Sequence, residues 1–249
     1  MKTVLITGAT SGIGEATARL LAKNYRIIAC GRNADALQTL HKELIAQTEI
    51  ICLKFDQRDL EEVKNAMESL PEDWKQIDVL INNAGNAHGL ESLVESNIED
   101  WDNILDGNVK GLLYVSKQII PGMINRKSGH IVNISSVAAR QTYANGVVYC
   151  ASKKAVDVIS EGMRLELTES GIKVTNIQPG LVETNFSKVR FKGDEERAKT
   201  VYQGYKALEP NDIADAIAYC INAPKHVTIS DLTIYPSAQS EPRTVYKNI

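Results

Sequence analysis

The chain has 249 residues, 43% hydrophobic and 24% charged, which is the profile of a globular protein that can bury a large core without disulfides or metal ions. Its formal net charge of −3 gives no electrostatic reason to bind nucleic acid or an anionic membrane surface. The apolar run at residues 4–6 is too short for the core of a signal peptide, and no later stretch is long enough to span a membrane. We therefore expect a cytoplasmic protein.

Cysteines and histidines are dispersed along the chain. The four cysteines contain no Cys-x-x-Cys pair, and the four histidines have no metal-ligand spacing. We therefore expect reduced thiols and no metal site.

Short runs of β-branched residues alternate with helical patterns along the whole chain. The predicted strands cover residues 3–7, 26–30, 49–55, 77–81, 129–134, 172–177 and 228–234. The predicted helices cover residues 12–24, 34–47, 59–70, 99–126, 147–169 and 210–222. Nearly continuous apolar strands that alternate with helices predict a single α/β domain over residues 1–249, with a doubly wound parallel sheet of the Rossmann type.

The only long stretch without a predicted strand covers residues 182–208, between the sixth strand and the last helix. An insertion at the carboxyl end of a strand is where an active-site lid is expected in this architecture. A helical excursion over the surface, without a role in binding, is the alternative. We predict a helical substrate lid over these residues.

A glycine-rich turn joins the first predicted strand to the first predicted helix. Gly8, Gly12 and Gly14 follow the spacing G-x-x-x-G-x-G, and Thr10, Ser11 and Ile13 stand between them. Glycines allow a close approach of the backbone, and the N-terminus of a helix offers unpaired N–H groups to a pyrophosphate. A tight turn without a ligand is the alternative, but the position between strand and helix favours a dinucleotide site.

The end of the second strand carries the signal for the choice of cofactor. An NAD site places Asp or Glu there, about 20 residues past the glycines, to hold the adenosine ribose. This chain has Arg32 and Asn33 instead. A guanidinium can pair with the 2′-phosphate of NADP, so NADP is predicted; a solvated arginine is the alternative. Asp56, at the end of the third strand, is either near the adenine rim or an exposed loop acid.

Tyr149 and Lys153 are four residues apart and therefore share one face of a helix. A phenol has an ordinary pKa of about 10, and a nearby ammonium group favours its ionised form. The pair is thus suited to acid/base catalysis, although many such pairs are simply one side of a helix. Ser136 lies thirteen residues upstream, just past the fifth strand.

The glycine turn, the Ser136–Tyr149–Lys153 group and several further motifs occur in one order along the chain. Through these motifs the sequence resembles the short-chain dehydrogenase/reductase family over essentially its whole length. The residues that carry the resemblance are Thr7-Gly8-Ala9-Thr10-Ser11-Gly12-Ile13-Gly14, Asn82-Asn83-Ala84-Gly85, Asn108, Ile134-Ser135-Ser136, Tyr149 with Lys153, and Pro179-Gly180.

The resemblance implies a role for each matched residue. Tyr149 would exchange a proton with the substrate hydroxyl, Ser136 would orient the substrate oxygen, and Lys153 would lower the pKa of Tyr149 and hold the nicotinamide ribose. Asn108 would support a proton relay through water. Ser135 is the competing serine, and its spacing to Tyr149 fits less well. The expected cofactor contacts are Gly8, Thr10, Ser11, Gly12, Ile13, Gly14, Arg32, Asn33, Asp56, Asn83, Gly85, Tyr149, Lys153, Pro179, Gly180, Val182 and Thr184.

The last third of the chain resembles a narrower group, the NADP-dependent 3-hydroxy acid dehydrogenases, through residues 179–193 and 233–239. That group oxidises serine and allo-threonine and reduces malonic semialdehyde. A short hydroxy acid must be held by its carboxylate, and Arg190 and Arg140 are the candidate partners beside Ser136 and Tyr149.

The family resemblance also implies a homotetramer that packs through the helices near residues 99–126 and 147–169. Two alternatives to a hydroxy acid dehydrogenase stay open. One is a carbonyl reductase of the same fold that acts on sugars, steroids or other ketones, and the other is a non-catalytic protein that senses NADP.

Overall fold

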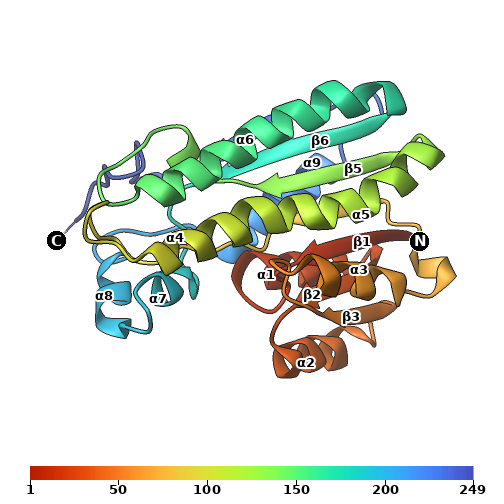
Figure 1. Cartoon of the computed structure of the whole chain (residues 1–249), viewed down its shortest axis with the longest axis horizontal. Helices are drawn as coiled ribbons and strands as arrows, with labels where there is room; N and C mark the ends of the chain where they lie inside the picture. The colour runs from red at the N-terminus through yellow and green to blue at the C-terminus, as the bar shows by residue number, and fades with distance from the viewer. Residues whose placement is uncertain (249) are drawn as a thin grey trace.

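A seven-stranded sheet, parallel throughout, forms the centre of the computed structural model, which describes residues 1–248 (Figure 1). The spatial order of the strands is β3-β2-β1-β4-β5-β6-β7. Their bounds are β1 Lys2–Thr7, β2 Tyr25–Gly31, β3 Ile50–Lys54, β4 Val79–Asn82, β5 Gly129–Ile134, β6 Ile172–Pro179 and β7 Asp231–Ile234. The order reverses between β1 and β4, and such a switch point is where doubly wound sheets bind ligands. The predicted Rossmann-type fold is therefore confirmed.

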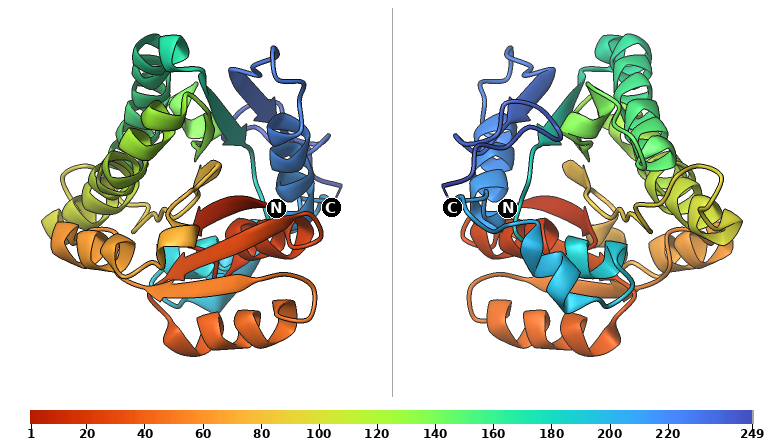
Figure 2. Two further views of the ribbon diagram at one scale, coloured as in Figure 1. Left: turned by 90° about the vertical axis from the view of Figure 1, so that its right-hand side faces the viewer. Right: turned by 90° about the vertical axis from the view of Figure 1, so that its left-hand side faces the viewer.

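Helices cover both faces of the sheet, as Figure 2 shows in two end views. The long helices are α1 Gly12–Leu21, α2 Ala34–Leu44, α3 Leu60–Glu68, α4 Ile98–Leu105, α5 Gly111–Arg126, α6 Val147–Leu167 and α9 Pro210–Ile221. One core packs α1, α2 and α9 against the sheet, and a second core packs α3, α5 and α6 on the opposite face. Apolar side chains predominate in the central strands β1, β2 and β4, because both faces of the sheet are covered.

Local signals in the sequence explain where several helices begin. The side chain of Asp59 accepts hydrogen bonds from the backbone N–H groups of Glu61 and Glu62 at the start of α3. A reciprocal capping box between Glu209 and Asp212, with Pro210 in the first helical position, starts α9. These caps satisfy N–H groups that have no partner inside the helix.

The long helix predicted over residues 99–126 is not continuous. A π-helical turn, Asp106–Lys110, separates α4 from α5. The buried side chain of Asn108 within this turn donates to the backbone oxygen of Asn86 at 2.9 Å and to the Ser152 hydroxyl at 3.0 Å. An apolar pattern of helical period does not reveal one inserted residue, so the prediction missed a turn that is common at functional sites.

The predicted seventh strand is also shorter than expected, because residues 228–230 do not join it. The hydroxyl of Thr175 donates to the backbone oxygen of Ile229 at 2.7 Å, and Lys173 reaches the backbone oxygen of Val227 at 3.1 Å. Side chains of β6 thus bind this backbone before regular pairing begins, at Asn176 with Asp231.

Residues 182–208 form two short helices, α7 Phe186–Arg190 and α8 Glu195–Thr200, so the helical part of that prediction is confirmed. The segment starts and ends at a bridge between Val182 and Leu208. Figure 1 shows α7 and α8 at the end of the molecule that lies away from the N-terminus, beyond the arrowheads of the strands. We call residues 182–208 the lid segment. Among residues 1–248, no helix is both long and apolar enough to cross a membrane.

Candidate active site

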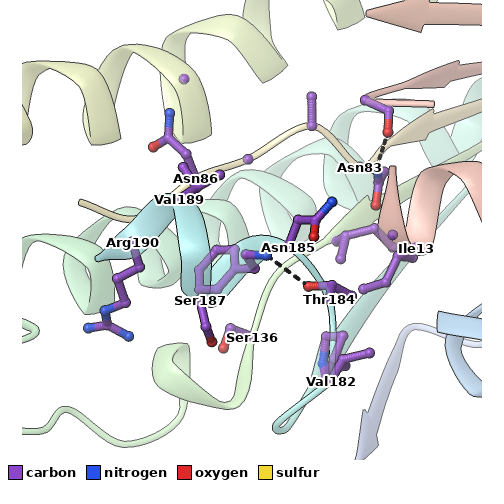
Figure 3. Close-up of a pocket in the computed structure, with 18 of the residues that line it drawn as sticks. Ile13, Asn83, Asn86, Ser136, Val182, Thr184, Asn185, Ser187, Val189 and Arg190 are labelled. Carbon is purple, nitrogen blue, oxygen red and sulfur yellow. Dashed lines mark hydrogen bonds between the residues drawn. The ribbon is translucent and has the colours of Figure 1, made fainter. Parts of the chain in front are cut away.

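A cavity of about 490 Å³ lies at the carboxyl ends of the strands. Its wall includes the glycine turn after β1, the loops after β2 to β6, the start of α6 and much of the lid segment. Figure 3 shows Ile13 and Asn83 toward one end of this cavity, and Ser136 and Arg190 toward the other. Most of the residues that the sequence singled out are brought together here.

The glycine turn leaves no room for side chains. A Cβ atom on Gly14 would lie 2.3 Å from the backbone oxygen of Gly8 and 2.4 Å from Nδ2 of Asn83. Gly8 and Gly12 have φ angles of 65° and 56°, which side chains disfavour. Gly8 and Gly12 line the cavity, whereas Gly14 lies behind them and keeps α1 close to the turn.

The N-terminus of α1 faces this cavity through Ser11, Gly12 and Ile13. The Ser11 side chain makes no capping hydrogen bond, so the first N–H groups of the helix are open to an anion. Asn83 fixes the turn from β4: its Nδ2 donates to the backbone oxygens of Thr7 at 2.9 Å and Gly8 at 3.2 Å. Thr10 also lines the cavity, against Gly31.

Basic side chains stand beyond β2 and β3. The side chain of Arg32 is 63% exposed, and among residues 1–248 it forms one ion pair, a long one of 3.7 Å to Asp56. Asp56 is bound closely by Arg58, with distances of 2.6 to 3.1 Å. Burial raises the pKa of the Asp56 carboxyl, but the hydrogen bonds and charge of Arg58 outweigh it, so the pKa is lowered overall. Asn33 lines the cavity as well, although its side chain caps α2.

The two neighbouring serines after β5 have different surroundings. The hydroxyl of Ser135 has one proton, which two acceptors share: the backbone oxygen of Lys153 at 3.0 Å and the carboxylate of Asp157 at 2.8 Å. The hydroxyl of Ser136 accepts a hydrogen bond from the backbone N–H of Ala138 at 3.1 Å and is also hydrogen-bonded to the Tyr149 side chain. Ser136 is therefore the serine whose proton is available at the cavity.

Tyr149 and Lys153 project from the first turns of α6 and are buried, 9% and 5% exposed. The ammonium nitrogen of Lys153 lies 6.0 Å from the centroid of the Tyr149 ring and donates to the backbone oxygen of Ile134 at 3.0 Å. The helical spacing thus places both groups in one cavity with Ser136.

The expected lowering of the Tyr149 pKa is not what the structure gives. Burial raises this pKa above its ordinary value, and the hydrogen bond with Ser136 and the charge of Arg190 offset only part of the rise. Burial also lowers the pKa of Lys153 to about 8, so its charge is itself costly at this depth. A phenol with a raised pKa is neutral at pH 7 and available as a proton donor.

Asn108 and Lys153 meet across Gly85. A Cβ on Gly85 would lie 3.1 Å from Oδ1 of Asn108 and 3.2 Å from Nζ of Lys153, which explains a glycine there. Asn108 itself does not line the cavity; its Oδ1 accepts from the backbone N–H of Asn86 at 2.7 Å. The side chain of Asn108 therefore holds the loop after β4 in place beside Lys153.

The strand end of β6 carries four expected cofactor residues, Pro179, Gly180, Val182 and Thr184, and all four line the cavity. The methyl group of Thr184 lies 3.2 Å from where a Cβ of Gly12 would be, so the lid segment starts directly over the glycine turn. Figure 3 shows the hydroxyl of Thr184 bound to the backbone N–H of Phe186, at 3.1 Å.

The two arginines proposed for the substrate lie in different places. Arg190 lines the cavity, and the Cζ of its guanidinium is 5.5 Å from the centroid of the Tyr149 ring. Its Nε donates to the backbone oxygen of Gly89 at 3.0 Å and its Nη1 to the Tyr143 hydroxyl at 3.2 Å. Arg140 is not among the described cavity residues; it donates to Gln178 and Thr233 instead. The structure thus moves Arg140 out of the candidate substrate site.

Several residues of the site were missed from the sequence, among them Tyr143, Arg58 and Gln57. Tyr143 holds Arg190, Arg58 holds Asp56, and Gln57 donates to the backbone oxygens of Ala84 at 3.1 Å and Gly107 at 2.7 Å. Arg58 and Gln57 directly follow Asp56, at the carboxyl end of a parallel strand, so their position alone was a usable signal. Tyr143 lies in a loop whose path no periodic pattern describes.

Comparison with known proteins agrees with this geometry. The family model described as short chain dehydrogenase matches residues 2–195. The chain is 43% identical over 239 residues to the NADP-dependent 3-hydroxy acid dehydrogenase YdfG of Salmonella typhi, which covers 95% of this chain and 96% of that protein. It is 38% identical over 250 residues to an NADP-dependent 3-hydroxy acid dehydrogenase of Schizosaccharomyces pombe, covering 99% and 96%.

Solved structures give the same result. The closed form of serine dehydrogenase complexed with NADP+ superposes with a TM-score of 0.92 at 42% identity, over 96% of each chain. Serine dehydrogenase from Escherichia coli superposes with a TM-score of 0.83 at 37% identity, over 96% of this chain and 99% of that one. With a family model over most of its length and relatives this similar, the chain belongs to the short-chain dehydrogenase family.

Proposed function

We propose that this protein is an NADP-dependent oxidoreductase that interconverts a short 3-hydroxy acid and the corresponding carbonyl acid. The observation that carries the proposal is the convergence of Ser136, Tyr149 and Lys153 in one cavity with Arg190 5.5 Å from the Tyr149 ring. Tyr149 supplies a proton donor and Arg190 a group that binds carboxylates. Together they fit a substrate whose hydroxyl lies close to its carboxylate. The relatives named 3-hydroxy acid and serine dehydrogenase support the same substrate class.

The residues at the other end of the cavity fit NADP. The glycine turn has space for backbone only, and the N-terminus of α1 offers N–H groups to the pyrophosphate. Arg32, which lines the cavity beyond β2, would bind the 2′-phosphate of NADP; its guanidinium is largely unpaired among the described residues because Arg58 neutralises Asp56. Thr184 and Gly180 are placed to hold the nicotinamide end, and the cofactor would supply hydride transfer there.

In this proposal the protein residues position the substrate and move its proton. Tyr149, neutral at pH 7, donates its proton to the carbonyl oxygen during reduction and becomes a phenolate; in the oxidation direction the phenolate takes up the proton of the substrate hydroxyl. Ser136 donates a hydrogen bond to the same oxygen and keeps it in line with the phenol. Lys153, which reaches the site from the next turn of α6, holds the cofactor ribose and exchanges protons readily because its pKa is about 8.

Arg190 would bind the carboxylate. The guanidinium is already fixed by Gly89 and Tyr143, which leaves Nη2 and part of Nη1 free to donate to the substrate. Because the lid segment carries Arg190, binding of the carboxylate and closure of this segment over the cavity would occur together.

We also propose that the protein is a cytoplasmic homotetramer. Exposed apolar side chains on α5 and α6 support self-association: Leu113 and Ile124 are each 40% exposed, Val158 is 59% exposed, and Leu165 is 80% exposed. Figure 1 shows these two helices side by side over one face of the sheet. Light scattering should give a particle near four times 27.4 kDa, and a monomer at micromolar concentration would contradict the proposal.

The proposed activity is tested with a panel of alcohols and two cofactors. We expect NADP+ to be reduced with serine, allo-threonine, 3-hydroxyisobutyrate or 3-hydroxypropionate, much faster than with sugars, steroid alcohols or simple alcohols, and NAD+ to be a poor substitute. Added EDTA should not change the rate, because residues 1–248 contain no cluster suited to a metal ion. Turnover of only unrelated alcohols would contradict the proposed substrate class, and no turnover at all would favour an NADP-sensing role.

A further inference from the structure

A second arginine, Arg243, reaches the substrate end of the cavity from the C-terminal part of the chain. Its Cζ lies 5.5 Å from the centroid of the Tyr143 ring, and the Cζ of Arg190 lies 5.8 Å from the same centroid. The two guanidiniums are therefore no farther apart than the sum of these two distances. Neither forms an ion pair with a described residue, although Arg190 is held by hydrogen bonds.

Arg243 is presented by a well-anchored turn. Pro242 and Arg243 are the central residues of a turn closed by a hydrogen bond from the N–H of Thr244 to the backbone oxygen of Glu241, at 3.3 Å. The Glu241 carboxylate accepts from Gln141 at 2.8 Å, which ties the turn to the loop that carries Tyr143. Glu241 does not line the cavity, so it does not screen Arg243 there.

A second anchor holds the same segment from the opposite side. The side chain of Gln239, only 5% exposed, accepts from the backbone N–H of Leu181 at 2.9 Å, directly before the lid segment. The backbone N–H of Tyr246 donates to the backbone oxygen of Ala238 at 2.8 Å. Arg243 is thus fixed between the lid segment and the loop after β5.

The charged side chains at the substrate end of the cavity are all positive. Lys153, Arg190 and Arg243 all line it, whereas the only carboxylate among the described cavity residues is Asp56, which Arg58 binds near Arg32. Like charges held this close in a partly dry site favour an anionic ligand. The substrate carboxylate beside the reacting hydroxyl neutralises Arg190. Arg243 would then still lack an anionic partner.

We propose that Arg243 binds a second anionic group of the substrate, so that the preferred substrates are 3-hydroxy acids with a further carboxylate or phosphate on the far side of the hydroxyl-bearing carbon. This inference rests on the proposed function, since Arg190 must hold the first carboxylate. Arg243 donates to the second anion and acts on specificity, while Tyr149 and Ser136 act on the hydroxyl as before.

The test uses one hydroxy diacid and its half ester. The kcat/KM for NADP+ reduction is measured with 3-hydroxyglutarate, its monomethyl ester and 3-hydroxybutyrate. Loss of one charged hydrogen bond lowers kcat/KM by about tenfold or more. The kcat/KM of the wild-type protein should therefore be at least about tenfold higher for the diacid than for the half ester. Arg243→Gln should lose most of this preference, chiefly by a fall in kcat/KM for the diacid, and Arg243→Glu should reverse it by repulsion.

Arg19→Gln is the charge-matched control, because Arg19 lies on the outer side of α1 in ion pairs with Glu15 and Glu43. It should keep the wild-type preference. Unfolding curves and NADPH titration check that each variant is folded and binds cofactor. The inference would be overturned by any of three results. The wild-type protein could have equal kcat/KM for the diacid and the half ester, Arg243→Gln could lower kcat/KM equally for both, or Arg19→Gln could lose the preference as well. If none of the three acids is oxidised, the proposed function itself fails.

Discussion

Replacement of Lys153 by Met should stabilise the cofactor-free fold while it abolishes activity. Lys153 is buried, and burial lowers its pKa from 10.5 to about 8 although the charge of Asp157 acts in the opposite direction. That shift corresponds to about 3 kcal/mol of unfavourable free energy at neutral pH, at about 1.36 kcal/mol per unit. The hydrogen bond to Ile134, which Met cannot make, offsets about 1 kcal/mol of this. The expected gain in free energy of unfolding is therefore about 2 kcal/mol.

The gain should depend on pH in a defined direction. The pKa of Lys153 is lower in the folded than in the unfolded chain, so the unfolded chain binds the extra proton. The penalty is fully present below about pH 8 and fades as the pH rises toward the unfolded value of 10.5. Urea unfolding of wild-type protein and Lys153→Met at pH 7 and at pH 10 measures it. A less stable variant at pH 7, or a gain that is the same at both pH values, would show that the buried charge of Lys153 does not destabilise the fold.

Three further changes test individual parts of the site. Tyr149→Phe deletes the proposed proton donor but keeps the buried ring, so it should bind NADPH normally in a fluorescence titration and retain less than a tenth of the wild-type kcat. Arg32→Asp should shift the ratio of kcat/KM for NADP and NAD toward NAD by at least about tenfold, since it removes the cation and adds repulsion; an unchanged ratio would show that Arg32 does not read the phosphate. Gly14→Ala would place a methyl group 2.3 Å from the backbone oxygen of Gly8, so both thermal stability and NADPH affinity should fall, and normal affinity would mean that the turn tolerates the displacement.

Sequence patterns predicted the sheet and most helices because each depends on local periodicity. Most strands are covered on both faces and therefore contain short apolar runs, and the helices carry an apolar pattern of helical period. The π-helical turn at Asn108 was invisible to that reasoning, since its cause is the hydrogen bonding of Asn108 to Asn86 and Ser152, which are distant in sequence.

The part of the candidate site that lies at the carboxyl ends of the strands could be predicted from the sequence. Ser136, Tyr149 and Asn83 follow or face the carboxyl ends of parallel strands, and the fold brings such positions together. Long-range loop packing was not predictable. Arg190 and Arg140 looked equivalent as cations in the sequence, and only the path of the lid segment separates the one in the cavity from the one bound to Gln178.

The same limit applies to electrostatics. A lysine four residues from a tyrosine predicts a lowered phenol pKa, but the depth of burial, which depends on the whole α6 environment, reverses the direction for Tyr149. Burial is a property of the tertiary structure and outweighs a single neighbouring charge here.

In the proposed mechanism one cavity joins a proton donor, Tyr149, to a carboxylate-binding group, Arg190. The most direct measurement compares kcat/KM for 3-hydroxybutyrate and for its methyl ester in the wild-type protein and in Arg190→Ala. Loss of a charged hydrogen bond costs about 1.5–3 kcal/mol, so Arg190→Ala should lower kcat/KM for the acid by about tenfold to 150-fold and for the ester far less. Equal losses for acid and ester would contradict the account, because Arg190 would then not be reading the carboxylate.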